Sequence, residues 1–319
     1  MAVNADKPHL WKQDVAQSVD FYNQWFMQFA PLTYRETRIT ATQRVKIALQ
    51  KTSYLMNITP SALKLYPESL ETLRMSTAPP LARDRLIGLA SVSSNLVKSM
   101  EDEAKIPPHM SATDVDVQLA AVGKIIHRMA DRDIFPWLDT RIGPSPDQIE
   151  RAATIVADRL CGAAANPIIR NEQERRQLTT IESWLKQRGY IQATARKGVT
   201  LQTIPRGSYA FRFNTLVYLS SNKAVNIPID AVVMPMYASA DALPLLIEAK
   251  SAGDFTNTNK RRKEEAVKMA QLKKTYGDNV SFILFLCGYF DSGYLGYEAA
   301  EGIDWVWEHR INDLVQFGL

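Results

Sequence analysis

The sequence lacks the disulfide framework of small secreted proteins and the long apolar segment of membrane proteins. Its 319 residues include only two cysteines, Cys161 and Cys287, too few for a disulfide framework or a cysteine-rich metal site. The longest apolar stretch, residues 280–290, is far shorter than the ~20 residues that a membrane-spanning helix needs. Residues 1–6 show no basic segment leading into an apolar one, so no secretory signal is expected. We therefore expect a reduced, cytoplasmic protein without a membrane partner.

Several catalytic motifs are also missing. The four histidines are scattered and form neither His-Glu-x-x-His nor His-x-His, which argues against a zinc hydrolase. No Gly-x-x-x-x-Gly-Lys-Ser/Thr phosphate loop and no Gly-x-Ser-x-Gly turn occur. Arg206-Gly-Ser-Tyr209 is similar to the Gly-Ser signature of nucleotidyltransferases, but Asp230-Ala-Val232 lacks the second carboxylate that those enzymes need. A nucleotidyltransferase therefore stays only as a distant alternative.

What is present is an ordinary globular composition with an uneven distribution of charge. Hydrophobic residues make up 46% of the chain and charged residues 23%, and the length suggests two domains. The net charge is only +4, but residues 260–274 are strongly basic and residues 281–319 are acidic. A concentrated basic segment suits a polyanionic partner such as DNA, and an exposed helix face is the simpler alternative.

The first half of the chain has the periodicity of helices. Apolar residues recur at helical spacing in residues 11–29, 42–56, 81–100, 115–129 and 147–160. Pro79-Pro80 suits the first turn of one helix, and residues 111–114 can cap another. Strand signals are nearly absent before residue 190. We expect a helical domain over residues 1–165, used for dimerisation, DNA recognition or both.

The second half, residues 166–319, has the pattern of a mixed sheet flanked by helices. After a charged helix at 169–188, alternating apolar residues at 209–219 and 224–234 indicate paired strands. Further strands are expected at 243–249 and 280–286, with a helix at 260–274 between them. Residues 303–315 are expected to be mostly helical, so that Trp305 and Trp307 point to opposite sides and one of them lies at a surface or a subunit contact. The predicted fold class is α+β or α/β.

Charged residues at the strand ends support a catalytic hypothesis. Glu248 and Lys250 lie on the same face of one strand because side chains alternate, and Asp230 on the neighbouring strand can lie beside them. Burying such a cluster without a ligand is costly, and Mg2+ held by Asp230, Glu248 and the Ala249 carbonyl relieves that cost. The expected chemistry is metal-assisted hydrolysis of a phosphodiester, with Lys250 orienting water and stabilising charge on the phosphate. Ordinary charges at the end of a sheet are the alternative.

These residues also carry a resemblance to a known family. Pro228-Ile-Asp230 with Glu248-Ala-Lys250 resembles the active site of PD-(D/E)XK nucleases, with one extra residue between Pro and Asp. Wider stretches resemble type II restriction endonucleases of the XamI group, at residues 72–75, 79–88, 170–174, 250–265 and 305–310. The resemblance implies a PD-(D/E)XK mixed-sheet domain that cleaves double-stranded DNA with Mg2+ and leaves 5'-phosphate ends. It also implies a cognate DNA methyltransferase as genetic partner, and double-strand cleavage at a palindrome predicts a homodimer.

Two acids on the helix that enters this domain are further candidates. Related nucleases often place an additional carboxylate there, so Glu174 and Glu182 are candidates for a metal contact or for positioning water. Glu174 lies in a resembling stretch, and we therefore place it in the catalytic set. The alternative for both is an exposed helix with ion pairs, such as Glu172 with Arg175.

The polar segment that follows Lys250 is the candidate for reading DNA. Asparagine can pair with adenine edges, and arginine can pair with guanine or grip phosphate. The start of the following helix also attracts phosphate. The candidate DNA-binding residues are Asn257, Asn259, Lys260, Arg261, Arg262 and Lys263. Two other functions stay open beside a restriction enzyme: a structure-specific repair or recombination nuclease of the same fold, and a non-catalytic DNA-binding protein.

Overall fold

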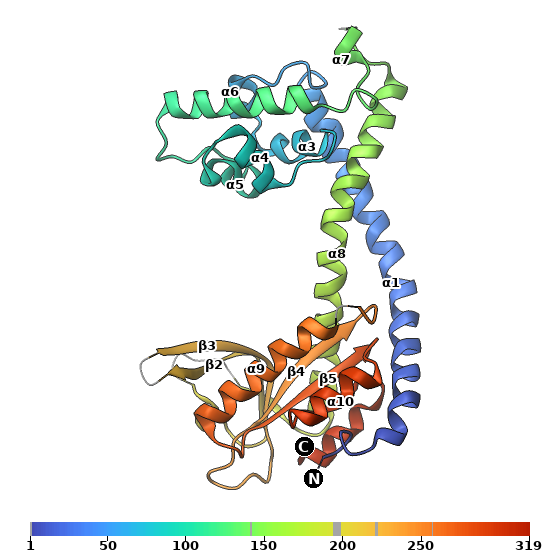
Figure 1. The fold of residues 1–319 in the computed structure, drawn as a ribbon, viewed down its shortest axis with the longest axis vertical. Coiled ribbons are helices and arrows are strands. Elements are labelled where there is room, and N and C mark those ends of the chain that lie inside the picture. Colours follow the sequence, from blue (N-terminus) through green and yellow to red (C-terminus); the bar gives the residue numbers. More distant parts are fainter. Residues whose placement is uncertain (1, 141, 194–198, 221–222, 257) are drawn as a thin grey trace. The chain divides into compact units, whose positions relative to one another are not determined.

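The computed structural model describes residues 2–140, 142–193, 199–220, 223–256 and 258–319, with side chains described outside 220 and 258–261. The chain divides into two compact units (Figure 1). The sheet unit comprises Met1–Phe29 and Arg170–Leu319, and the helical unit comprises Ala30–Ile169. The domains expected from the sequence, 1–165 and 166–319, differ from these units mainly at the N-terminus. The reason is tertiary packing, since Trp11 lies edge-on against Trp305 with ring centroids 5.5 Å apart.

The sheet unit is built on six strands in the order β1-β2-β3-β4-β5-β6. Strand β3 pairs antiparallel with β2 and with β4. The other pairs are parallel: β1 with β2, β4 with β5, and β5 with β6. Parallel neighbours need crossovers, which are supplied by α9 (Thr258–Tyr276) and α10 (Ser292–Ala300). The strands are β1 Ile191–Gln192, β2 Ser208–Ser220, β3 Lys223–Met234, β4 Leu245–Ala252, β5 Ser281–Gly288 and β6 Asp304–Trp307.

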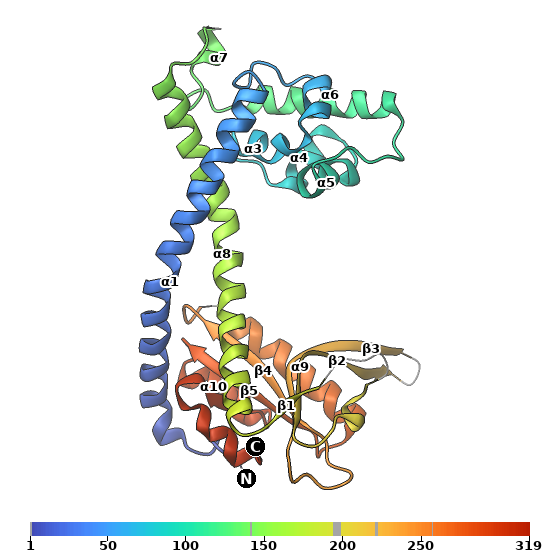
Figure 2. The same cartoon turned by 180° about the vertical axis from the view of Figure 1, so that it is seen from behind.

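The sheet is the middle of three layers. Its α9 and α10 side buries Leu246, Leu284 and Trp305 with Leu272 and Leu295 of those helices. Figure 1 shows this side in front, and Figure 2 shows α8 (Pro146–Gln187) covering the other. The face toward α8 has a separate core that includes residues 181 and 185 of that helix. Since β5 is covered on both faces, each of its residues after the first is buried.

The strands predicted at 209–219, 224–234, 243–249 and 280–286 and the helix predicted at 260–274 are confirmed. The prediction of helix from residue 303 is wrong at its start. Residues 304–307 form β6, and only then does a 3-10 helix, η3 (Glu308–Phe317), begin. Trp305 and Trp307 therefore point to the same side, because alternate residues of a strand share a face. Both are fully buried in one core, so neither lies at a surface.

Two helices, α1 (Pro8–Lys51) and α8, have residues in both units and continue through Pro31 and Pro167. Each therefore replaces a pair of helices expected from the sequence. Residues 81–100 instead form two helices, because Ser91 ends the first of them in the left-handed conformation with φ of 53°. The other helices of the helical unit are α2 Pro60–Leu65, η1 Pro67–Ser69, α3 Leu70–Met75, α4 Arg83–Ala90, α5 Ser94–Glu103, α6 Ala112–Met129 and α7 Trp137–Thr140. In the described ranges, no helix is long and apolar enough to cross a membrane.

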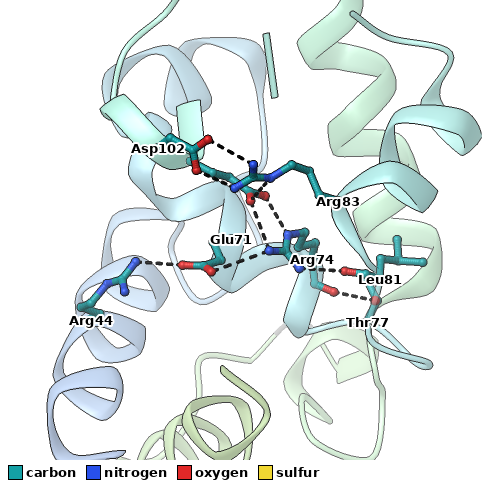
Figure 3. Close-up of polar contacts among 8 residues, drawn as sticks. Arg44, Glu71, Arg74, Thr77, Leu81, Arg83 and Asp102 are labelled. Atoms are coloured by element: carbon teal, nitrogen blue, oxygen red, sulfur yellow. Dashed lines mark hydrogen bonds and ion pairs between the residues drawn. The ribbon is translucent and has the colours of Figure 1, made fainter. Parts of the chain in front are cut away.

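A network of buried charge holds α3, α4 and α5 together (Figure 3). The Glu101 carboxylate, whose side chain is 1% exposed, accepts hydrogen bonds from Arg74 at 2.7 Å and from Arg83 at 2.9 Å. Arg83 also binds Asp102 at 2.6 Å, and Arg74 donates to the Leu81 carbonyl at 3.0 Å. Arg74 and Arg83 belong to the stretches 72–75 and 79–88 that resemble the XamI group. In this structure those two arginines hold the helical unit together.

Candidate active site

The candidate site lies where β3 and β4 part. Their pairing includes Ala231 with Ile247, and continuing that register by one position sets Asp230 opposite Glu248. At this point an Asp230 carboxylate oxygen accepts a hydrogen bond from the Ala249 backbone N–H at 2.8 Å. Lys250 follows on the same face of β4 as Glu248. The structure thus brings together the three side chains, Asp230, Glu248 and Lys250, that the sequence singled out.

Glu248 is the most enclosed member of this group, with 6% of its surface exposed. Its Oε1 atom lies 3.1 Å from the Lys250 ammonium and 2.8 Å from that of Lys268. Its Oε2 atom is buried and has no hydrogen-bond partner among the described residues. One oxygen of this carboxylate is therefore neutralised by two cations, while the other remains available to a ligand.

Lys268 was not found from the sequence. It reaches the site from α9, where it also donates to the Pro228 carbonyl at 3.0 Å. The basic run contains many lysines, so charge alone does not distinguish it. Its helical spacing does: Glu265, Met269 and Leu272 are buried on the same side of α9, and Lys268 lies among them.

The environment shifts the pKa values of the site in a consistent way. Burial, together with the charge of Glu248, raises the pKa of Asp230 to about 6. Burial acts to lower the pKa of Lys250, but the charges of Glu248 and Glu265 outweigh it and raise that pKa above its ordinary value. Lys250 therefore stays protonated at neutral pH. Asp230 is mostly ionised at neutral pH and takes up a proton near pH 6.

This set of donors fits a hard divalent cation. Asp230, the free oxygen of Glu248 and the Ala249 carbonyl are oxygen ligands, which Mg2+ prefers. Within the ranges that the structure describes, no group of three or more His, Cys, Asp or Glu is arranged to hold a metal ion. A cation at this site would take two carboxylates from the protein and complete its shell with a carbonyl, water and substrate oxygen.

Helix α8 supports the site from the opposite layer through residues that the sequence analysis missed. The Gln177 amide donates to the Lys250 carbonyl at 3.3 Å and to the Phe285 carbonyl at 3.1 Å. The Ser251 hydroxyl donates to Gln173 at 3.3 Å. Both glutamines are buried and lie four positions apart, a spacing that marks one helix face.

The two other candidate acids on α8 face β2. Glu174 forms an ion pair with Arg212 at 3.0 Å, and its side chain is 40% exposed. Glu182 pairs with Lys186 at 2.7 Å and accepts a hydrogen bond from the Tyr209 hydroxyl at 3.4 Å. The described contacts therefore tie Glu174 to the exposed Arg212 and Glu182 to Lys186 and the buried Tyr209, and do not bring either acid to Asp230.

The candidate DNA-reading residues lie at the start of α9. Asn257 is outside the described residues, and Asn259, Lys260 and Arg261 lie in the helix with side chains outside the described part. The Arg262 guanidinium lies 3.6 Å from the centre of the Tyr297 ring on α10. Lys263 is exposed.

Comparisons with known proteins agree with this chemistry. The family model described as "XamI restriction endonuclease" matches residues 53–307. The type II restriction enzyme SalI of Streptomyces albus G is 54% identical over 316 residues, which are 99% of each chain. The type II restriction enzyme XamI of Xanthomonas campestris pv. amaranthicola is 28% identical over 203 residues, 63% of this chain and 65% of that enzyme. No solved structure matches the chain significantly.

Proposed function

The chain belongs to the XamI restriction endonuclease family, and from that premise we propose that it is a type II restriction endonuclease. It cleaves both strands of DNA at a specific sequence by hydrolysing phosphodiesters. The observation that carries the chemistry is the buried Glu248 carboxylate beside Asp230, with one oxygen on two ammonium groups and the other unpaired among the described atoms. An ordinary structural carboxylate would have both oxygens satisfied.

The site residues divide the chemical work. Asp230, Glu248 and the Ala249 carbonyl would hold a divalent cation, for which we propose Mg2+. Such a cation polarises the scissile phosphate and lowers the pKa of a bound water. Lys250, kept protonated by its acidic neighbours, donates hydrogen bonds to the attacking water and to the phosphate oxygens. Hydrolysis then breaks the bond to the 3' oxygen and leaves 5'-phosphate and 3'-hydroxyl ends.

The finer assignment of the fold is also part of the proposal. We assign the sheet unit to the PD-(D/E)XK class, because an antiparallel pair carries Asp230 and Glu248-Ala-Lys250 and a helical crossover leads to a parallel strand. The helical unit would serve dimerisation or DNA recognition. Glu174 stays a candidate for the catalytic set, on condition that its ion pair with Arg212 opens when DNA binds.

The proposed partners follow from the substrate. A palindromic DNA site is cut most simply by a two-fold homodimer, and a cognate methyltransferase would protect the host DNA. Light scattering on the free chain and on its complex with a short duplex tests the dimer, which a monomer in both states would contradict.

For the α9 segment, Arg262→Ala should weaken binding to DNA, and a salt series with cognate and altered duplexes separates base contacts from phosphate contacts.

The central experiment is digestion of a sequenced plasmid with Mg2+, followed by mapping of the ends. Discrete fragments with 5'-phosphate ends, lost when the cation is chelated, are expected. Cleavage only at branched or damaged DNA would instead identify a structure-specific nuclease. Salt-dependent binding without any cleavage would identify a DNA-binding protein and contradict the proposal.

A further inference from the structure

A second buried acid lies next to the proposed catalytic lysine. Glu265 of α9 is 1% exposed, whereas its neighbour Glu264 is exposed. Its Oε1 atom lies 3.7 Å from the Lys250 ammonium. Its Oε2 atom accepts a hydrogen bond from the Tyr294 hydroxyl of α10 at 2.6 Å. Glu265 thus connects the helix layer to the strand that carries Lys250.

Two groups of α10 that lie near Glu265, Tyr294 and Glu298, are held in their neutral forms. Glu298 is completely buried, and burial together with the charge of Glu265 raises its pKa to about 8. Burial and the same charge also raise the pKa of Tyr294 far above its usual value. At neutral pH both groups therefore keep their protons. Tyr294 donates a hydrogen bond to Glu265, and the protonated Glu298 forms a second one with it. The nearest opposite charge described for Glu265 is the ammonium of Lys250.

The buried Glu265 carboxylate needs a counter-charge, and Lys250 supplies it. A buried carboxylate loses its hydration, and an ion pair repays that loss only when its geometry is close and its lone pairs are satisfied. Here the ion pair, at 3.7 Å, is longer than a hydrogen bond. The Lys250 ammonium also contacts Glu248, whose Oε1 atom is 3.1 Å away. If Glu248 serves a cation, Glu265 is the counter-charge that remains for Lys250.

We propose that Glu265 is a positioning residue, which is itself held by the Tyr294 hydroxyl and directs the Lys250 ammonium toward the scissile phosphate. The inference rests on the proposed role of Lys250 in DNA hydrolysis. Glu265 acts on the reaction through that ammonium, which contacts both Glu265 and Glu248. Tyr294 acts one step further away, by fixing one oxygen of Glu265.

The test compares Glu265→Gln with Glu264→Gln, a matched change of charge on the exposed side of the same helix. In single-turnover cleavage of plasmid with saturating Mg2+, the Glu265 variant should be about 10- to 100-fold slower, the usual range for a residue that supports a ligand or catalytic group. Its affinity for the same DNA, measured without divalent cation, should be unchanged. Tyr294→Phe should slow the same step by a smaller factor, and the Glu264 variant should match the wild type.

A second measurement does not depend on cleavage. Urea unfolding of Glu265→Gln, Lys250→Met and the double variant, without metal, should be non-additive by roughly tenfold in the unfolding equilibrium constant, as expected for residues in contact. Additive effects overturn the inference, as does a Glu265 variant that cleaves as fast as the Glu264 variant. A wild-type chain that cuts no DNA would instead overturn the proposed function, while the unfolding cycle would still report whether Glu265 holds Lys250.

Discussion

Two clusters of buried charge in this molecule satisfy their carboxylates to different degrees. In the helical unit, the buried Glu101 carboxylate receives two arginines, and each of its oxygens has a donor (Figure 3). In the sheet unit, Oε2 of the buried Glu248 carboxylate has no hydrogen-bond partner in the described chain. The first cluster is satisfied by the protein alone, and the second is not.

The difference between the clusters follows from the cations that they use. The planar guanidinium of arginine presents several donors that match a carboxylate, so Arg74 and Arg83 close their network. A lysine ammonium is a compact charge that approaches one oxygen, as Lys250 and Lys268 both approach Oε1 of Glu248. Complete pairing is therefore typical of a structural network, and incomplete pairing indicates a place for substrate and cation.

The largest expected effect is the loss of cleavage when the open cluster is changed. Asp230→Ala, Glu248→Ala and Lys250→Ala should each reduce the cleavage rate by about 10³-fold or more, because they remove cation ligands or the donor to the phosphate. The circular dichroism spectrum should stay unchanged, and single-turnover plasmid cleavage measures the rate. Wild-type cleavage by any two of these variants would contradict the assignment of the site.

The second prediction concerns the closed Glu101 network of the helical unit. Glu101→Gln should lower the free energy of unfolding by about 3–5 kcal/mol, the usual cost of removing one partner from a buried ion pair. Urea unfolding measures it, with Glu103→Gln on the same helix as an exposed control. A loss below 1 kcal/mol would show that the closed network is not what stabilises the helical unit.

Addition of a divalent cation should distinguish the clusters directly. A ligand that binds only the folded chain stabilises it by about 2.7 kcal/mol at 100 times its Kd. Thermal unfolding with increasing Mg2+ or Ca2+ should show this gain in the wild type and in Glu101→Gln, but not in Asp230→Asn. An equal gain in Asp230→Asn would place the cation elsewhere.

The smallest expected effect concerns pH and Glu298. Because the pKa of Glu298 is raised from its ordinary value of 4.5 to about 8, the folded chain holds a proton there that the unfolded chain has lost. Its contribution to stability is complete below pH 4.5 and falls by at most about 1.4 kcal/mol per pH unit up to pH 8. Glu298→Gln should remove this slope from urea unfolding measured at pH 6, 7 and 8. An unchanged slope would show that another group titrates.

The sequence was informative where the backbone itself fixes the period. Alternation along β3 and β4 put Asp230, Glu248 and Lys250 within reach of one another before any tertiary contact was known. Lys268 and Glu265 could not be placed in this way, because their position depends on which face of α9 packs against the sheet. Within a run of charges, that face shows only as a weak helical repeat.

The errors in the predicted fold have the same origin. Residues 304–307 are too few to show alternation clearly beside charged neighbours, so the pattern predicts helix where β6 forms. Residues 11–29 have a clear helical repeat, but the repeat does not reveal which surface the helix covers. Trp11 packs on Trp305, almost a full chain length away, and Asp14 pairs with Arg310 at 2.8 Å. Such long-range contacts join the N-terminus to the sheet unit.

The hydrogen bond between the Asp230 carboxylate and the Ala249 N–H makes this aspartate part of the sheet as well as part of the site. Its side chain serves a backbone donor at the place where the strands separate. Alanine at 230 would orphan that donor, but asparagine offers it a carbonyl oxygen of nearly the same shape. Asp230→Asn is therefore the preferred inactive variant for trapping an uncut duplex in crystals. It should abolish cleavage while it preserves the hydrogen bond to the Ala249 N–H.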